Sequence, residues 1–350
     1  MSNAFPKYEY YAGGMTMGEV FDQSIRLYRR NFFTLVGILM RVYVPLMVLR
    51  ILVEIASNSS IVSSEPMIKW YTTLLLSLAL VAPKFVQTFL SMGLTAIPMA
   101  RAVGSLWLGV PIRVRDAYRR VFPLWRSWLG TMGLLGIILV LMLLWTVIPV
   151  VGWLSGPALL LVLCLVIPPM LGPLIAFERK SGWSAIKRTW DLVRPRFWWL
   201  LTVLIAMYAL GRWLLTGPLL TAEMVFAFIS DGSLNPDWIL PSLRILTALV
   251  TMLADLLFLP LGMTMMTLIY LDHRMRVDGL DLALHVDASS SPLDVLEKFP
   301  APDTPLHLDR RDRINLSALS ALVIGAGYLA YVYPQVVTMA LFLLSVFGLI

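Results

Sequence analysis

The chain has 350 residues, of which 59% are hydrophobic and only 14% are charged, and its mean hydropathy is +0.79. Soluble domains contain roughly 45–50% apolar and about 25% charged residues, so this composition excludes a soluble globular protein and predicts a polytopic membrane protein. The formal net charge of +7 does not indicate a nucleic-acid partner, because most basic residues flank apolar runs, where they orient a membrane protein.

Cysteine content and the N-terminal residues add two expectations. The single cysteine, Cys164, lies within an apolar run, so we expect no intrachain disulfide and no cysteine metal cluster. Residues 1–31 contain no apolar stretch of the signal-peptide kind, and the first apolar run is therefore expected to stay in the mature protein.

A first amphipathic helix is predicted after residue 15. Thr16 and Glu19 match a T-x-x-E capping box, in which each side chain satisfies the other residue's free backbone N–H. The apolar stripe that follows has helical spacing and consists of Phe21, Ile25, Tyr28 and Phe32. Three basic residues lie off this stripe: Arg26, Arg29 and Arg30. Because the stripe leads directly into an apolar run, we expect this lead helix to lie flat in the membrane surface.

The same spacing recurs twice more without gaps. The second stripe comprises Ala117, Val121, Leu124 and Trp128, and the third comprises Ile186, Trp190, Val193 and Phe197. The basic residues that accompany them are Arg119, Arg120 and Arg126, then Lys187, Arg188, Arg194 and Arg196. Three cytoplasmic lead helices in this pattern favour an internal repeat. The alternative explanation is that any membrane protein places basic residues before its apolar helices.

Six apolar segments are predicted to cross the membrane, and their bounds are close to residues 32–55, 69–103, 128–150, 153–177, 197–216 and 239–271. The second would measure roughly 52 Å as one helix, against a hydrocarbon core of about 30 Å, so it must break or protrude, with a kink expected at Pro83. Loops on one side are rich in arginine and those on the other are uncharged or acidic, so both ends of this core are expected in the cytoplasm.

The composition changes after residue 271. Residues 272–315 are polar and rich in proline, which predicts a largely irregular cytoplasmic linker. Residues 316–350 form a further apolar segment, interrupted by Gly325, Gly327 and Pro334, with one span expected up to Tyr333. The expected organisation is a six-span membrane core over residues 1–271, the linker, and a C-terminal transmembrane segment. The fold class is therefore all-α, a polytopic transmembrane helix bundle.

Three segments of the chain resemble a known family. They are TMGEVFDQSIRLYRRNF, ERKSGWSAIKRTWDLVRPRFW and YLDHRMRVDGLDL. Together they are similar to the poorly characterised prokaryotic membrane proteins related to the glycerophosphoryl diester phosphodiesterase membrane domain. The resemblance covers about residues 15–285 and implies a helical, multi-pass protein of the prokaryotic cytoplasmic membrane. In that family the membrane domain stands alone or precedes a phosphodiesterase domain.

Signals for catalysis are missing from the sequence. A phosphodiesterase of that kind needs a soluble barrel with histidines and clustered carboxylates on a metal, and the chain has no room for one. None of the histidines, His273, His285 and His307, has a second metal ligand at the usual spacing. No phosphate loop, H-E-x-x-H or G-x-S-x-G pattern occurs. We therefore expect no enzymatic activity, no cofactor and no bound metal.

Charged residues inside the predicted spans are the remaining candidates for a specific site. An ionised group there is costly without a partner or a water-filled cavity. The four furthest from the predicted ends are Arg41, Lys84, Arg212 and Asp255. Arg41 and Asp255 are predicted to lie at matching depth and to form an ion pair inside the bundle. Near the end of the sixth segment, Tyr270, Asp272 and His273 are expected at the membrane interface.

These observations leave two functions open. The first is a non-catalytic membrane module whose basic lead helices bind anionic lipid or a membrane protein partner, and in which neutralising Arg119, Arg120 and Arg126 weakens binding to anionic vesicles. The alternative is a transporter or lipid translocator with a charged cavity lined by Arg41, Lys84 and Asp255.

Overall fold

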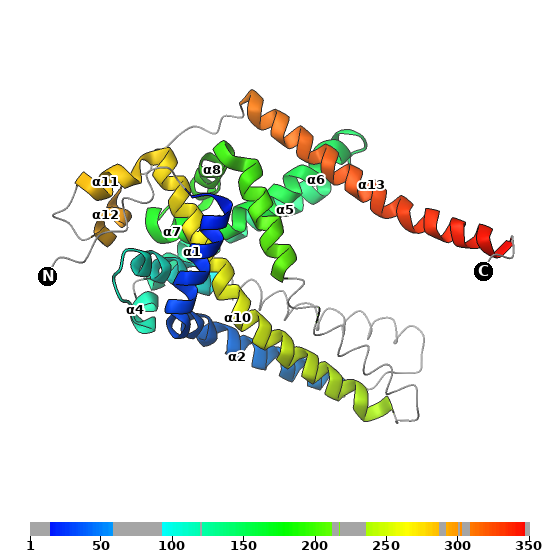
Figure 1. The fold of residues 1–350 in the computed structure, drawn as a ribbon, viewed down its shortest axis with the longest axis horizontal. Helices are drawn as coiled ribbons and strands as arrows, with labels where there is room; N and C mark the ends of the chain where they lie inside the picture. The colour runs from blue at the N-terminus through cyan, green and yellow to red at the C-terminus, as the bar shows by residue number, and fades with distance from the viewer. Residues whose placement is uncertain are drawn as a thin grey trace.

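Residues 15–58, 93–119, 121–211, 217, 236–286, 292–299, 302 and 309–346 are described by the computed structural model, and all regular elements among them are helices (Figure 1). The predicted all-α fold class is confirmed. Five of these helices are long and apolar enough to cross a membrane: Phe32–Leu49, Trp125–Trp145, Val151–Glu178, Gly182–Gly211 and Met252–Asp278. They identify a multi-pass integral membrane protein. The kink predicted at Pro83 lies outside the described residues.

Helix α1 (Met17–Arg30) begins with the predicted capping box. The Thr16 side chain accepts a hydrogen bond from the backbone N–H of Glu19, and the Glu19 carboxylate accepts one from the backbone N–H of Thr16 at 2.6 Å. The bonds from Thr16 hold the pKa of Glu19 below its usual value. Asn31 caps the other end, and α2 (Phe32–Asn58) follows immediately.

The other two predicted lead helices show the same order of elements. Helix α4 (Val114–Arg119) and the 3-10 turn η2 (Phe122–Leu124) precede α5 (Trp125–Trp145). Helix α8 (Gly182–Val193) and the 3-10 turn η4 (Arg194–Arg196) precede the helical residues 197–211. Each turn contains a proline, Pro123 or Pro195, whose missing N–H interrupts the α-helical hydrogen bonds.

The apolar stripe of α8 is covered by protein, whereas that of α1 is only partly covered, with Ile25 42% exposed. All four residues of the third stripe, from Ile186 to Phe197, are buried, and α8 packs against α5, α7 (Ile167–Glu178) and α10 (Pro236–Asp278). Helix α1 runs antiparallel to α10, because the Tyr28 hydroxyl donates to the Leu257 carbonyl at 2.8 Å while the start of α1 lies beside Asp272. The prediction that the lead helices lie flat in the membrane surface is therefore wrong for α8.

Helix α10 has an exposed half and a covered half. Leu249, Leu253 and Leu257 are exposed at i, i+4 spacing on one face, as expected of a helix that contacts lipid. Between residues 258 and 275 no side chain of α10 is exposed, because α1, α7 and α8 pack around this part. We call the covered half of α10 (residues 258–278), together with α1, α8 and α12 (Pro292–Lys298), the cap (Figure 1).

The cap corrects the interfacial placement predicted for three residues. Tyr270, Asp272 and His273 are buried in the cap. The sequence shows that α10 is longer than the bilayer requires, but the helices that cover its end come from distant parts of the chain. Protein contacts therefore replace the expected contact with lipid headgroups.

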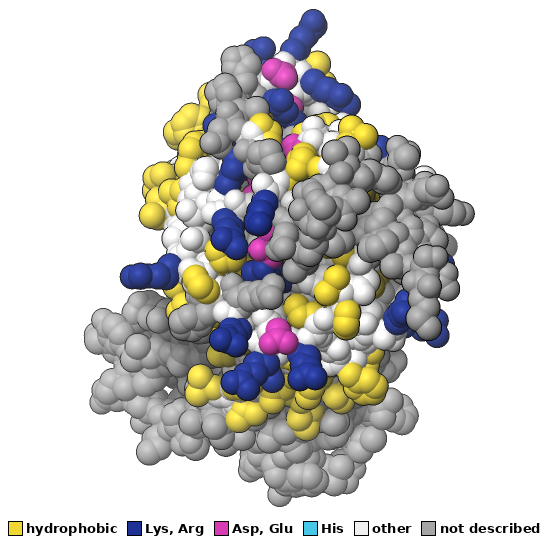
Figure 2. Space-filling model, turned by 90° about the vertical axis from the view of Figure 1, so that its left-hand side faces the viewer, with side chains coloured by type: hydrophobic (Ala, Val, Ile, Leu, Met, Phe, Trp, Pro, Cys, Tyr) yellow, Lys and Arg dark blue, Asp and Glu magenta, His cyan; other side chains and the backbone are white. Residues whose placement is uncertain are grey.

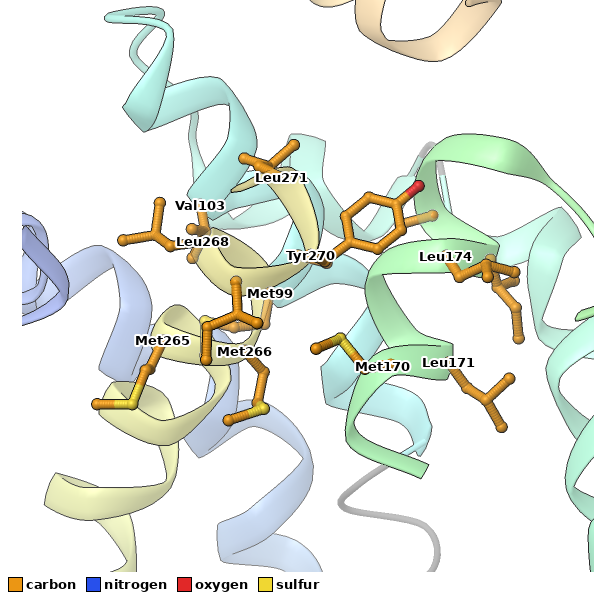
Figure 3. Packing of buried hydrophobic residues seen from close by; sticks show 14 of the residues in the cluster. Met99, Val103, Met170, Leu171, Leu174, Met265, Met266, Leu268, Tyr270 and Leu271 are labelled. Carbon is orange, nitrogen blue, oxygen red and sulfur yellow. The ribbon is translucent and has the colours of Figure 1, made fainter. Parts of the chain in front are cut away.

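A methionine-rich core lies between α7, α10 and the helical residues 93–107 (Figure 3). Its labelled residues include Met99, Met170, Met265 and Met266, whose flexible side chains fill irregular gaps between helices. Close approach is made possible by small residues: a Cβ built on Gly172 of α7 lies only 2.7 Å from the Ala96 side chain. This small-residue contact is typical of helix packing in membranes.

The C-terminal part differs from the prediction in two ways. Helix α10 continues to Asp278, and α11 (Leu280–Val286) and α12 follow, so the predicted linker is not largely irregular where it is described. Helix α13 (Arg310–Val346) is continuous through Gly325, Gly327 and Pro334, where an interruption was expected, and it packs against α6 (Val151–Leu161). In Figure 1 its C-terminal half extends away from the cap.

Candidate functional site in the cap

The sharp turn between α7 and α8 brings two charged residues together. Arg179, at the end of α7, has a left-handed backbone with φ of 54°, and Gly182 follows with φ of 58°. The turn is fastened to α5, because the Gly182 N–H donates to the Thr131 hydroxyl at 2.7 Å. Helix α8 therefore folds back on α7, and Arg188 donates from Nε to Glu178 Oε2 at 3.0 Å.

The Arg188–Glu178 pair belongs to a buried set of charges that we call the inner network, formed with Tyr270, Arg274 and Asp278. Arg188 also forms an ion pair with Asp278, and the Tyr270 hydroxyl donates to Glu178 Oε1 at 2.9 Å. The Nε atom of Arg274 lies 3.7 Å from Glu178 Oε1 and 3.6 Å from Asp278 Oδ2. None of the four charged side chains is more than 2% exposed. Two carboxylates and two guanidinium groups therefore neutralise one another inside the protein.

Arg274 also joins the inner network to α12. Its two terminal nitrogens donate to the backbone carbonyls of Leu296 and Phe299, at 3.0 and 2.8 Å. On the same helix, Glu297 forms ion pairs with Arg101 and Arg179. Helix α12 is thus tied to α10, to the helical residues 93–107 and to the end of α7 by charged groups.

A second buried cluster surrounds Asp272 and fastens the start of α1. Asp272 accepts a hydrogen bond from the Met15 N–H at 2.8 Å and one from Arg276 Nε at 3.1 Å, and it lies 3.5 Å from Arg196 Nη1. Arg196 also donates to the Met15 carbonyl at 3.4 Å and stacks on Trp199, with 4.6 Å between its Cζ and the ring centre. One carboxylate therefore connects α10, η4 and the beginning of α1.

These contacts join the three segments on which the family resemblance rests. Met15 immediately precedes the first segment, Glu178, Arg188 and Arg196 belong to the second, and the DHRMRVD part of α10 belongs to the third. Arginine stays charged and donates hydrogen bonds but is not a proton source at neutral pH. The geometry of the two clusters is therefore that of ionic cross-links between chain segments.

Basic side chains also cover the outer surface of this end of the molecule. Figure 2 faces the end where α4, α11 and α12 lie in Figure 1, and it shows many Lys and Arg side chains and few acidic ones. Arg29, Arg30, Arg119 and Arg126 are exposed, and none of them forms an ion pair with an acidic residue in the described part of the chain. We call these four residues the outer arginines.

The remaining basic candidates have different surroundings. Arg26 pairs with Asp22 on the surface of α1, Lys187 is half-buried, and Arg194 lies 3.7 Å from Asp309. Arg188, which was predicted to face lipid or a partner, is buried in the inner network, and that prediction is wrong. Arg120 lies outside the described residues.

The predicted ion pair between Arg41 and Asp255 is not the arrangement found. Asp255 accepts a hydrogen bond from the Tyr43 hydroxyl, whereas Arg41 is exposed and lies near Tyr118 of α4. Residues 41 and 43 differ by about 200° around a helix, so only one of them can face α10. The other two intramembrane candidates, Lys84 and Arg212, lie outside the described part of the chain.

Glu178, Arg274 and Asp278 were not predicted as site residues from the sequence. A signal for Arg274 and Asp278 was present in DHRMRVD, where Asp272 with Arg276 and Arg274 with Asp278 are acid–base pairs at i, i+4. The interfacial location predicted for Tyr270, Asp272 and His273 implied water and lipid headgroups, and not buried side chains, as the partners of Arg274 and Asp278. Their partners on α7 and α8 are about 90 residues away along the chain and have no local pattern in common with them.

No protein-family model matches this chain, and comparisons with curated proteins and with solved structures find no match either. Among the described residues, no group of three or more His, Cys, Asp or Glu side chains is placed to hold a metal ion. The proposals below therefore rest on the geometry of the cap and its surface.

Proposed function

We propose that the protein is a non-catalytic integral membrane module whose outer arginines, on α1, α4 and α5, form a basic surface for anionic lipid. One observation carries this proposal: the charges of the cap and the outer arginines differ in their surroundings. The carboxylates of Glu178 and Asp278 are engaged by buried arginines, and that of Asp272 by the partly exposed Arg196 and Arg276. The outer arginines are exposed and have no acidic partner among the described residues. The positive charge that is not neutralised internally is thus available at the surface.

The position of this surface fits a membrane partner. The exposed tryptophans Trp183 and Trp198 lie at the start of α8 and just after η4, and such residues are typical of the membrane–water interface. Each basic side chain near an anionic bilayer contributes about 1 kcal/mol to binding. The four outer arginines together therefore give a clear preference for anionic over zwitterionic lipid.

We further propose that the cap faces the cytoplasm of a prokaryotic cell. The support comes from the arginine-rich loops at this end, which the positive-inside rule places in the cytoplasm, and from the family resemblance of the three segments that meet in the cap. This orientation puts the outer arginines against the leaflet that carries anionic lipid.

Native mass spectrometry of the full chain in mild detergent tests the lipid proposal. The protein is titrated with phosphatidylglycerol or phosphatidylcholine of the same acyl chains. We expect stronger retention of phosphatidylglycerol, a preference that declines with salt, and a weaker preference when Arg29, Arg30, Arg119 and Arg126 are all replaced by Gln. Equal retention of both lipids by the parent protein contradicts the proposal.

One observation favours the alternative function of a transporter or lipid translocator. The hydrogen bond between Tyr43 and Asp255 lies between α2 and α10, within candidate membrane spans, where polar groups often line a transport path. Lipid movement across proteoliposomes by the parent protein and by Asp255→Asn tests this alternative. Lipid movement that is lost in Asp255→Asn supports translocation. Lipid movement that is equal in proteoliposomes and in protein-free liposomes argues against it.

A further inference from the structure

Helix α2 has an outward stripe of apolar residues that contains one arginine. Phe33 is 88% exposed, Met40 and Val48 are 44% and 49% exposed, and the three share one face of the helix. Arg41 is exposed on the same face, about 14 Å along the helix from Phe32. An arginine on a lipid-facing surface is unfavourable unless its guanidinium group reaches polar groups or an anion.

Helix α4 crosses this stripe next to Arg41. The Val114 side chain contacts Gly37, with 3.5 Å between Val114 Cγ2 and a Cβ built on the glycine. The Tyr118 hydroxyl donates to the Ile38 carbonyl at 2.7 Å. These two contacts place α4 on α2 about one helical turn before Arg41.

Tyr118 connects Arg41 to the charged flank of α4. Burial raises the pKa of Tyr118 to about 12, and the nearby positive charge of Arg41 acts in the opposite direction. Arg115 and Arg119 are exposed, and their i, i+4 spacing places both on the flank of α4 adjacent to Tyr118. Asp116 is about 100° further around the helix from Arg115.

None of these three arginines is neutralised by the described part of the protein. Arg41, Arg115 and Arg119 form no ion pair with a described acidic residue. Immediately beyond Arg41 the exposed stripe is apolar again, through Val48 and Leu49. The corner between α2 and α4 therefore combines three exposed arginines with an apolar surface that continues along α2.

We infer that this corner binds one anionic phospholipid, with the phosphate held by Arg41, Arg115 and Arg119 and an acyl chain lying along Met40 and Val48. The inference rests on the proposed function and gives it a defined site. A lipid is the occupant because charge and apolar surface adjoin each other, whereas a soluble phosphate uses only the charge. Bound phosphate also supplies the counter-ion that Arg41 does not find among the described acidic residues.

The test compares single variants of the full chain by native mass spectrometry with dioleoyl phosphatidylglycerol. Arg41→Gln and Arg119→Gln, which alter two different helices, are each expected to weaken the tightest binding about fivefold, and the double variant about 25-fold. Arg41→Lys keeps most of the affinity. Arg311→Gln is the matched control, since it removes an exposed arginine from α13, far from α4 in Figure 1, and leaves the affinity unchanged.

Two further arms identify the ligand. The site of a lipid binds dioleoyl more tightly than dihexanoyl phosphatidylglycerol, and millimolar inorganic phosphate does not displace the long-chain lipid. Full displacement by phosphate, or no dependence on chain length, overturns the assignment to a lipid. If the parent protein prefers phosphatidylglycerol and both Arg41→Gln and Arg119→Gln bind it as tightly as the parent does, this site is overturned but the proposed function is not. A parent without any preference overturns the proposed function as well.

Discussion

Two ion pairs of the same kind have opposite surroundings. Asp22 with Arg26 on α1 and Asp272 with Arg276 on α10 both place the acid four residues before the base. The first pair is open to solvent, with Arg26 77% and Asp22 66% exposed, whereas the Asp272 side chain is 0% exposed. Asp272 also binds the Met15 N–H and lies beside Arg196. The same local pattern is therefore a surface feature in α1 and a cross-link between segments in α10.

The comparison extends to all the charges at this end of the molecule. Removing one member of a buried pair leaves the other without solvent or partner, which costs several kcal/mol, whereas an exposed pair contributes little. The inner network should therefore control stability, and the outer arginines should control binding. Replacing residues of each set separates the two contributions.

The largest effect is expected for Arg274→Ala. The change leaves Glu178 and Asp278 with Arg188 as their shared cation and removes the donors to the Leu296 and Phe299 carbonyls. We expect a loss of about 3–5 kcal/mol in the free energy of unfolding, measured by denaturant unfolding in detergent. Arg276→Ala, on the same helix and partly exposed, is the control. Equal stability of the two variants contradicts the role given to the inner network.

The next effect concerns Asp272→Asn, which removes the charge but keeps the shape. Arg196 and Arg276 lose their carboxylate partner, and the Met15 N–H keeps only a weaker acceptor. We expect about 1.5–3 kcal/mol of destabilisation and faster hydrogen exchange in α1. Exchange in α1 at the parent rate shows that Asp272 does not fasten this helix.

A smaller, more specific effect is expected from a double-mutant cycle on Arg188 and Asp278. Arg188→Leu and Asp278→Leu each leave a buried charge without one partner, whereas the double variant removes both charges of this pair. The double variant is expected to be more stable than the sum of the single changes by about 1–3 kcal/mol in unfolding experiments. Strict additivity indicates that the two residues do not interact.

The helices of the fold could be predicted from local patterns, but their contacts could not. The capping box at Thr16, the helical spacing of α8 and the all-α class each follow from residues close together in the chain. A helical apolar stripe does not specify whether lipid or another helix covers it, and for α8 the cover is protein. The ion pair expected between Arg41 and Asp255 was based on the depth of the two residues along their helices. It did not take into account which side of α2 faces α10, and that side carries Tyr43.

The presence of basic residues at the candidate site could be predicted from the sequence, but which of them form buried ion pairs could not. Basic residues of the lead helices were identified by composition, yet Arg188 proved to be buried and Arg29, Arg30, Arg119 and Arg126 exposed. Which arginines are internal depends on Glu178 and Asp278, the last residues of α7 and α10. These two helices are in contact but lie far apart in the sequence. Contacts over that separation have no signature in a single sequence.

The smallest effect is expected for Asp22→Asn, the surface counterpart of Asp272→Asn. Asp22 and Arg26 lie 2.7 Å apart, closer than the 3.1 Å between Asp272 and Arg276, so distance alone predicts the stronger interaction for the exposed pair. Water screens both charges on α1, and ordering two mobile side chains offsets part of their attraction. We therefore expect Asp22→Asn to change the free energy of unfolding by at most about 0.5 kcal/mol, with no change in hydrogen exchange of α1. If Asp22→Asn destabilises the protein as much as Asp272→Asn, burial is not what distinguishes the two pairs, and the division of this end of the molecule into stabilising and binding charges is wrong.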